Sequence, residues 1–144
     1  MRRTLLDLFS NKQWIAVRCL YHGGYMDARI KILVVDDNVD AADVLAEYLR
    51  IFGVDVVVAH GGIEALALAK AVLPTVIFLD IGMPEVDGYQ VAMALRADTT
   101  FDNVKIIALT AWGDVSSREK SKSAGFDLHL TKPANLDVLL GLAT

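Results

Sequence analysis

The segment Thr75–Pro84, TVIFLDIGMP, carries the strongest signal for the fold of this chain. Its first five residues are apolar or β-branched and show no helical period, which predicts a strand buried on both faces of a parallel sheet. The run ends in one carboxylate, Asp80, and the turn Gly82–Met83–Pro84 cannot continue the strand. Open α/β sheets bind ligands beyond the carboxyl ends of their strands, so Asp80 is the first candidate for a functional site.

Strand-like and helix-like segments alternate along the chain on both sides of this stretch. Strands are predicted at Ile30–Val35, Val54–Ala59, Thr75–Leu79, Val104–Thr110 and Asp127–Thr131. A helix is predicted after each strand, beginning near Asn38 or Asp40, after Gly61–Gly62, at Asp87–Gly88, at Asp114 and at Leu136. Five strands alternating with five helices predict an α/β fold in which helices cover both faces of a parallel sheet.

The helices differ in how firmly their apolar faces should hold them. Each of the first three helices should turn an apolar face to the core. The expected core-facing residues are Ala41, Val44, Leu45, Tyr48, Leu49 and Phe52 in the first helix, Ala65, Leu66 and Ala69 in the second, and Val91, Ala94 and Leu95 in the third. The segment Asp114–Ala124 is polar and carries Arg118, Glu119, Lys120 and Lys122. We therefore expect a solvated and weakly anchored helix there.

The composition indicates one soluble domain. The chain has 144 residues, a formal net charge of −4 and 54% hydrophobic residues. A negative charge argues against general nucleic-acid binding and suits a site that holds a cation. No apolar run approaches the ~18–20 residues that a membrane helix needs, so we expect no membrane partner. Cys19 is the single cysteine, so no intrachain disulfide can form, and we expect a cytoplasmic protein.

Residues 1–29 do not follow the regular alternation. Several apolar residues there fall at helical spacing, but Lys12 interrupts the pattern and His22–Gly23–Gly24 ends it. We interpret this segment as an N-terminal extension. Three interpretations stay open: the segment lies upstream of a native start near Met26, it is a mobile tail, or it forms a small docking helix.

Polar side chains stand at the ends of four predicted strands. These are Asp36, Asp37, Asp80, Thr110 and Lys132. Carboxyl ends of parallel strands share one edge of the sheet, so these side chains should meet there. Grouped carboxylates repel one another unless a cation neutralises them, and hard oxygen ligands without His or Cys favour Mg²⁺. The set suits in-line phosphoryl transfer to a carboxylate.

These residues carry a family resemblance. From Ile30 to Thr144 the chain resembles the receiver domain of two-component response regulators, through LVVDDN, LDIGMPEVDG, ALTA and TKP. The resemblance implies a flavodoxin-like, doubly wound (βα)5 fold with strand order 2-1-3-4-5, and a receiver domain over residues 30–144. It further implies that Asp80 is the phosphoacceptor and that Asp36, Asp37 and Asp80 hold Mg²⁺ together with the backbone carbonyl of Gly82. Thr110 resembles the switch hydroxyl and Lys132 the lysine that contacts a phosphoryl oxygen, and the Lys132–Pro133 peptide is expected to be cis.

One position departs from the family pattern. The switch residue three positions before the lysine is commonly Tyr or Phe, whereas here it is His129. Imidazole is smaller and can titrate near neutral pH, so a pH-sensitive switch is one hypothesis. A neutral, packed or surface histidine is the alternative, and we favour it.

The resemblance implies a single-domain signalling switch of a two-component phosphorelay, with self-catalysed phosphorylation and dephosphorylation as its only chemistry. A sensor histidine kinase or a histidine phosphotransfer protein would donate the phosphoryl group, and a downstream protein target would recognise the altered surface, from about Asp114 to Leu142. A homodimer is left open.

Three other functions also stay open. A Mg²⁺-dependent aspartyl-phosphate hydrolase is disfavoured because such enzymes carry two acids two residues apart on the first strand, whereas Asp36 and Asp37 are adjacent. The other two are a receiver-like scaffold that acts unphosphorylated and the receiver module of a hybrid sensor kinase.

Overall fold

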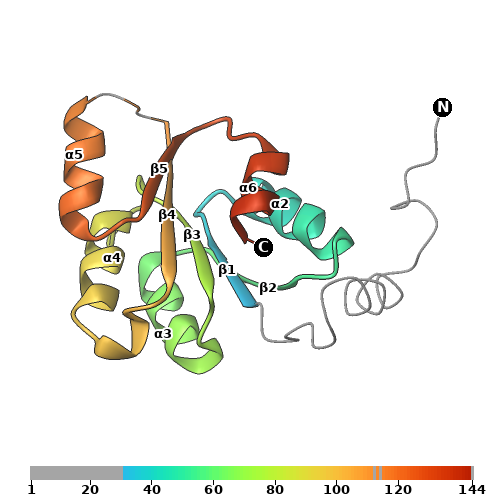
Figure 1. Cartoon of the computed structure of the whole chain (residues 1–144), viewed down its shortest axis with the longest axis horizontal. Coiled ribbons are helices and arrows are strands. Elements are labelled where there is room, and N and C mark those ends of the chain that lie inside the picture. Colours follow the sequence, from blue (N-terminus) through green and yellow to red (C-terminus); the bar gives the residue numbers. More distant parts are fainter. Residues whose placement is uncertain (1–30, 112, 114, 144) are drawn as a thin grey trace.

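Strands and helices alternate along the part of the chain that the structure describes. This computed structural model describes residues 31–111, 113 and 115–143. The elements are β1 Lys31–Val35, α2 Val39–Ile51, β2 Asp55–Ala59, α3 Gly62–Val72, β3 Val76–Asp80, α4 Gly88–Arg96, the 3₁₀ turn η2 Thr99–Phe101, β4 Lys105–Thr110, α5 Val115–Ala124, β5 Leu128–Thr131 and α6 Leu136–Ala143 (Figure 1). The predicted elements are confirmed to within a residue or two at their ends.

The sheet is parallel and has the predicted strand order, β2-β1-β3-β4-β5. β1 pairs with both β2 and β3, and its last residue, Val35, lies opposite Ala59 on one side and Leu79 on the other. Strand order 2-1-3-4-5 with alternating helices is the flavodoxin-like fold. The β3 strand therefore lies in the middle of the sheet, with Asp80 at its carboxyl end.

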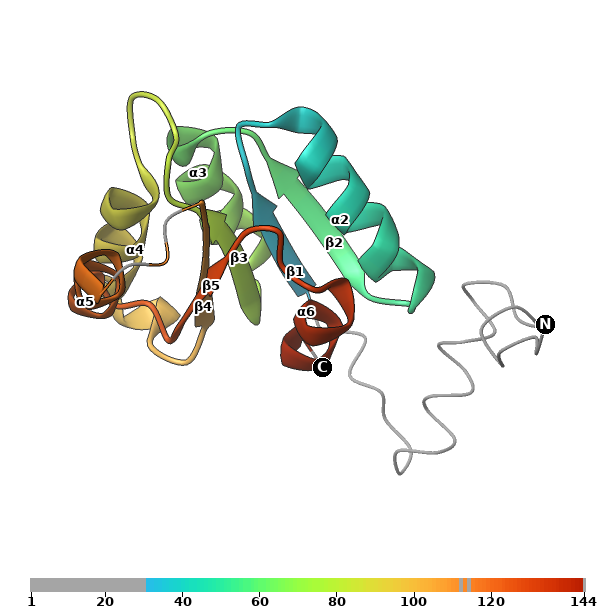
Figure 2. The ribbon, with the colours of Figure 1, turned by 90° about the horizontal axis from the view of Figure 1, so that it is seen from above.

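Helices cover both faces of the sheet. α2 and α6 pack on one face, and α3, α4 and α5 pack on the other (Figures 1 and 2). All five residues of β3 are buried, which agrees with the apolar run Val76–Leu79 that precedes Asp80. Under α3 and α4 the core includes Ile77, Leu79, Val91 and Leu95, and under α2 and α6 it includes Phe78, Leu45, Leu49 and Leu139.

Three predicted inward residues face solvent instead. Ala41 and Ala94 are exposed, and the Val44 side chain is 62% exposed. The buried residues of α2 are Ala42, Leu45, Ala46 and Leu49, and those of α4 include Val91, Ala92 and Leu95. Both possible stripes of α2 contain the same two leucines, so apolar character alone did not select the face. The helix turns its small alanines toward the sheet, where close approach favours small side chains.

Local sequence signals explain where the helices begin and end. Of the two predicted caps for α2, Asn38 is the N-cap, and its side chain accepts a hydrogen bond from Ala41 N. Asp87 and Gln90 form a reciprocal capping box at the start of α4. Gly53 follows α2 with φ of 78°, a left-handed conformation that favours glycine. The chain therefore leaves α2 through a glycine turn into β2.

Two predictions, the N-terminal extension and the absence of a membrane helix, can be compared only with the residues that the structure describes. The predicted N-terminal extension, residues 1–29, lies outside them. Among the residues described, no helix is both long and apolar enough to cross a membrane.

Candidate functional site

The acidic residues lie together at the carboxyl edge of the sheet. Asp36 and Asp37 directly follow β1, and Asp80 is the last residue of β3. Because Val35 of β1 is opposite Leu79 of β3, the chain leaves both strands at the same level of the sheet. Asp36 and Asp80 are 6% and 8% exposed, whereas Asp37 is exposed. The edge therefore holds two buried carboxylates and one that faces solvent.

The three carboxylates form one cluster with a lysine. One oxygen from each of Asp36, Asp37 and Asp80 lies within 4.8 Å of the others. Lys132 reaches the cluster from the loop after β5, with its Nζ 2.8 Å from Asp36 Oδ2 and 3.5 Å from Asp80 Oδ1. Asn38 N donates a hydrogen bond to Asp36 Oδ1. Residues 96 positions apart in the sequence, Asp36 and Lys132, are thus in direct contact.

Burial and crowding raise the pKa of the Asp80 carboxyl to about 6. The largest cause is burial, which disfavours the charged form, and the negative charge of Asp36 acts in the same direction. The Lys132 ammonium opposes this shift, while hydrogen bonds with the Asp36 and Asp37 side chains add to it. Without a cation, the cluster therefore holds a proton more tightly than separate aspartates would.

Lys132 keeps its positive charge in this setting. Burial lowers its pKa, but the hydrogen bond to Asp36 and the charges of Asp80 and Asp36 outweigh that effect and raise the pKa overall. The backbone fixes the approach of the side chain, since Lys132 N donates to Thr110 O at 2.7 Å. The Lys132–Pro133 peptide is cis, as predicted.

The cluster is consistent with a site for a hard divalent cation. Its candidate ligands are all carboxylate oxygens, two of the three aspartates are buried, and their mutual repulsion is the kind that a bound cation relieves. Oxygen ligands of this type suit Mg²⁺ better than the softer transition metals.

The structure also places the remaining predicted site residues. Thr110 is the last residue of β4 and is 1% exposed, beside Thr131 of β5 in the sheet. Gly82 is exposed and lies two residues beyond Asp80, in the turn before α4. His129 is half-buried in β5 and contacts Ser121 of α5. The functional roles of these three residues stay predictions.

Sequence reasoning missed the part that Gly88 plays behind Asp80. A Cβ atom on Gly88 would lie 2.5 Å from the Asp80 carbonyl oxygen and 2.7 Å from Ile81 Cα. Gly88 N also donates to Ile81 O at 2.9 Å. The first turn of α4 therefore rests directly on the backbone that carries Asp80. The Asp87–Gly88 pair indicated only a helix start, because a close backbone approach leaves no signal in periodicity.

His60 is a second missed neighbour of the site. Its Nδ1 lies 3.3 Å from the Asp36 carbonyl oxygen, and its backbone N donates to Glu64 Oε2 at 3.1 Å. The loop between β2 and α3 is thereby tied to the backbone of the acidic cluster. Nothing in the sequence indicated this contact, which joins residues 24 positions apart.

Comparison with known proteins agrees with this geometry. Residues 32–144 match the response regulator receiver domain. The protein PilG of Pseudomonas aeruginosa is 33% identical over 112 residues, which cover 78% of this chain and 83% of PilG. The crystallised chemotaxis protein CheY4 of Vibrio cholerae superimposes with a TM-score of 0.74 at 30% identity, covering 78% of this chain and 93% of CheY4.

A longer relative is similar over only part of its length. The DNA-binding dual master transcriptional regulator RpaA of Synechocystis is 34% identical over 110 residues, which cover 76% of this chain and 46% of RpaA. This chain thus spans less than half the length of that regulator. The match over residues 32–144, the parallel sheet of order 2-1-3-4-5 and the acidic cluster at its carboxyl edge all agree. The chain belongs to the family of response regulator receiver domains.

Proposed function

We propose that this chain is a phosphoacceptor switch in which Asp80 receives a phosphoryl group from a phosphohistidine donor. One observation supports this proposal above the others: Asp36, Asp37 and Asp80 converge within 4.8 Å, with the Lys132 ammonium against two of them. The cluster combines a nucleophilic carboxylate, oxygen ligands for a cation and a fixed positive charge, as phosphoryl transfer to a carboxylate requires.

Each residue takes a separate part in the proposed transfer. An Asp80 oxygen attacks phosphorus, the bond from phosphorus to the donor imidazole nitrogen breaks, and its electron pair stays on that nitrogen. Lys132, whose Nζ is 3.5 Å from Asp80 Oδ1, binds an oxygen of the transferred group. The Thr110 hydroxyl donates to another. Asp36, Asp37, Asp80 and the Gly82 carbonyl would hold Mg²⁺, which supplies charge that offsets the phosphoryl oxygens.

The partners follow from this chemistry at the level of protein class. Receiver domains are typically signalling switches rather than enzymes, and histidine kinases are their partners. We propose a sensor histidine kinase or a histidine phosphotransfer protein as donor, and a protein as the downstream target. A groove of about 620 Å³ lies beside the site, and we propose that the donor protein contacts it. Its lining runs from Asp36 and Lys132 to Val44, whose exposed side chain then has a contact role.

Incubation with acetyl phosphate tests this function directly. The wild-type chain should gain the mass of one phosphoryl group, about 80 Da, only when Mg²⁺ is present. Asp80→Asn should gain none, and intact-mass spectrometry measures both. An adduct that persists in Asp80→Asn would place the acceptor elsewhere. No adduct and no phosphate release would favour a scaffold that acts unphosphorylated, and rapid multiple-turnover release of phosphate from varied esters would favour a hydrolase.

A further inference from the structure

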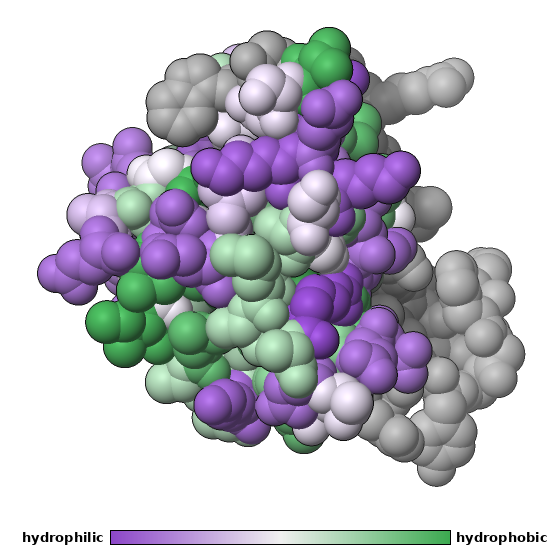
Figure 3. All heavy atoms as spheres, turned by 90° about the vertical axis from the view of Figure 1, so that its left-hand side faces the viewer, coloured by the Kyte–Doolittle hydropathy of each residue, from purple (hydrophilic) through white to green (hydrophobic). Residues whose placement is uncertain are grey.

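Helix α5 is held to the sheet in an unusual way. Of its ten residues only Ser121 and Ala124 are buried, and Val115 in its first turn is 72% exposed. Figure 3 shows hydrophilic side chains gathered over the upper part of this side of the molecule, where α5 lies. The apolar anchor, Ala124, is in the last turn. The middle of α5 therefore contacts the sheet through a serine, and its hydrogen bonds decide how firmly it sits.

Ser121 stands in the middle of a directed chain of hydrogen bonds. Its Oγ lies 2.9 Å from the Ser117 carbonyl oxygen and 2.8 Å from His129 Nδ1 in β5. A carbonyl oxygen can only accept, so the single hydroxyl hydrogen of Ser121 points to Ser117. The Ser121 oxygen then accepts from His129, which must carry a hydrogen on Nδ1. The order of donation is His129 to Ser121 to Ser117.

We propose that His129 is a positioning residue that holds α5 against β5 through the Ser121 hydroxyl. A Tyr or Phe at position 129 would offer no donor at the place that imidazole Nδ1 occupies, two bonds from Cβ. In this chain the contact between β5 and the middle of α5 is therefore polar and directional. Loss of the Nδ1 donor frees the first two turns of α5, while Ala124 and the residues after it stay in place.

The contact does not depend on the charge of His129. Nδ1 carries a hydrogen in the imidazolium and in one neutral tautomer, so the ring donates to Ser121 in both states. The charged groups lining the pocket between α5 and β5 are Arg118, Lys122 and Asp127, and Asp127 is paired with Arg96. Ala108 of β4 lies opposite His129 in the sheet. The geometry thus favours a pH-independent holding role over the pH-sensitive switch considered from the sequence.

Two substitutions at one position separate the donor from the ring. Asn carries its amide nitrogen two bonds from Cβ, as His carries Nδ1, whereas Gln carries it one bond further out. His129→Asn should keep α5 protected from amide hydrogen exchange. His129→Gln and Ser121→Ala should each speed exchange of the α5 amides by roughly 2- to 10-fold, the range expected for one lost hydrogen bond. The amides of α4 serve as the internal control and should not change.

A double-mutant cycle tests whether His129 acts through Ser121. If His129 acts through Ser121, then adding His129→Gln to Ser121→Ala should produce no further acceleration of α5 exchange. Protection factors of α5 in the wild-type chain should agree at pH 5.5 and pH 8. Additive effects, equal effects of His129→Asn and His129→Gln, or protection that changes across this pH interval would each overturn the proposal.

The role of His129 can be tested separately from the proposed function. The substitutions leave Asp80 and its neighbours untouched, so acetyl phosphate should still modify all variants, as intact mass reports. If the wild-type chain is not phosphorylated but the exchange results hold, the proposed function fails and the role of His129 stands. If phosphorylation proceeds but α5 exchange is unaffected by His129→Gln, the role of His129 fails and the function stands.

Discussion

Helices α4 and α5 lie side by side on one face of the sheet but are held by different forces. α4 buries Val91, Ala92 and Leu95 and begins with a reciprocal cap from Asp87 and Gln90. α5 has only Ala124 as a buried apolar residue. The contacts made by the middle of α5 are polar. Ser121 contacts His129 of β5, and the Lys120 ammonium lies 4.5 Å from the ring centroid of Tyr89 in α4.

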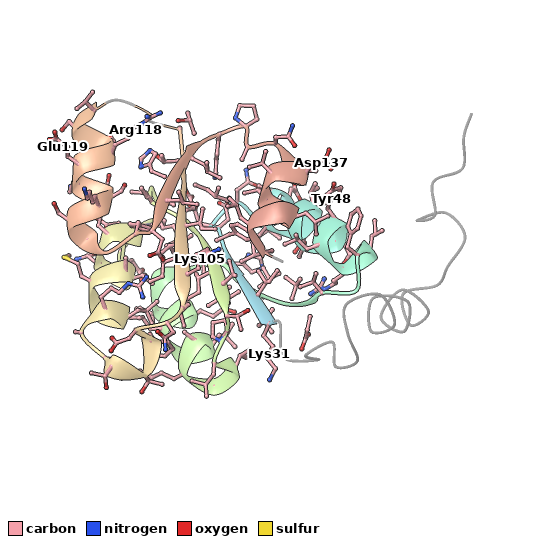
Figure 4. The ribbon with its side chains drawn as sticks, viewed as in Figure 1. Lys31, Tyr48, Lys105, Arg118, Glu119 and Asp137 are labelled. Carbon is pink, nitrogen blue, oxygen red and sulfur yellow. The ribbon has the colours of Figure 1, made fainter. Side chains whose placement is uncertain are left out.

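The two ends of α5 differ as well. Arg96, at the end of α4, donates to the carbonyl oxygens of Gly125, Phe101 and Val104 and pairs with Asp127. These bonds fix the turn that follows α5. Val115 in its first turn is 72% exposed, and Figure 4 shows Arg118 on the β5 side of α5 and Glu119 on the opposite side. α4 thus rests on the backbone that carries Asp80, whereas α5 buries little apolar surface and should be the less stable helix of the two.

A second pair of helices shows that polar contacts also join elements on the other face. Tyr48 of α2 donates a hydrogen bond to Asp137 of α6, and the two side chains point toward each other in Figure 4. The pKa of Tyr48 is raised, chiefly by this hydrogen bond. Here, however, Leu49 and Leu139 bury apolar surface beneath the contact, so the hydrogen bond adds to packing that α5 lacks.

The largest expected effect comes from removing the apolar anchor of α4. Leu95 is 1% exposed, and Leu95→Ala should lower the free energy of unfolding by about 2–5 kcal/mol, because it removes buried surface and leaves a cavity. Val115→Ala in α5 is the matched control and should change it by less than about 0.5 kcal/mol. Urea unfolding measures both. Similar losses in the two variants would contradict the difference between the helices.

Crowding the support behind Asp80 should have the next largest effect. Gly88→Ala places a Cβ against backbone atoms of Asp80 and Ile81, and we expect a loss of roughly 1–3 kcal/mol. Phosphorylation by acetyl phosphate should also slow, since the Asp80 backbone must shift. Gly141→Ala is the control, because its Cβ meets no atom within 4 Å inside α6. That variant should gain up to about 1 kcal/mol.

The acidic cluster should make stability depend on pH in the metal-free chain. The pKa of Asp80 is about 6 in the folded chain, above the ordinary carboxyl value of 3.8, so the folded state binds this proton more tightly. Stability from this group is present at low pH and is lost as pH rises from about 4 through 6. Asp80→Asn should therefore stabilise the metal-free chain by about 1–2 kcal/mol at pH 8 and by little at pH 4.5.

Added Mg²⁺ should make the wild-type chain more stable relative to Asp80→Asn at pH 8. At pH 8, added Mg²⁺ should raise the melting temperature of the wild-type chain and leave that of Asp80→Asn nearly unchanged, because binding requires the ionised carboxylates. Thermal melts with and without Mg²⁺ at both pH values provide the comparison. A pH profile of the wild type that parallels that of Asp80→Asn would show that Asp80 does not carry the effect.

The smallest effect should come from the contact between α5 and α4. Lys120→Gln removes the cation from the face of Tyr89 and should cost about 0.5 kcal/mol. We expect this cost to appear as faster amide exchange in α5 with little change in global unfolding. A global loss larger than that of Gly88→Ala would show that α5 is an integral part of the core.

Much of the fold was predictable because it depends on local patterns. The apolar run Val76–Leu79 ending at Asp80 marks a central strand, and the polar sequence of α5 marks a weakly anchored helix. Caps such as Asp87 need only residues a few positions away. The face of α2 was not predictable, since Ala42 and Val44 are both apolar and only the distance from helix to sheet favours the smaller side chain.

The order of strands and helices and the positions of Asp36, Asp37 and Asp80 could be inferred from the amino-acid pattern alone, because periodicity and caps act over a few residues. Which atoms touch became clear only from the folded chain. Lys132 reaches Asp36 across 96 positions, Gly88 lies against the Asp80 backbone, and His129 meets Ser121. Such contacts depend on strand register and on how closely backbones pack, and neither can be predicted from the sequence pattern of one segment.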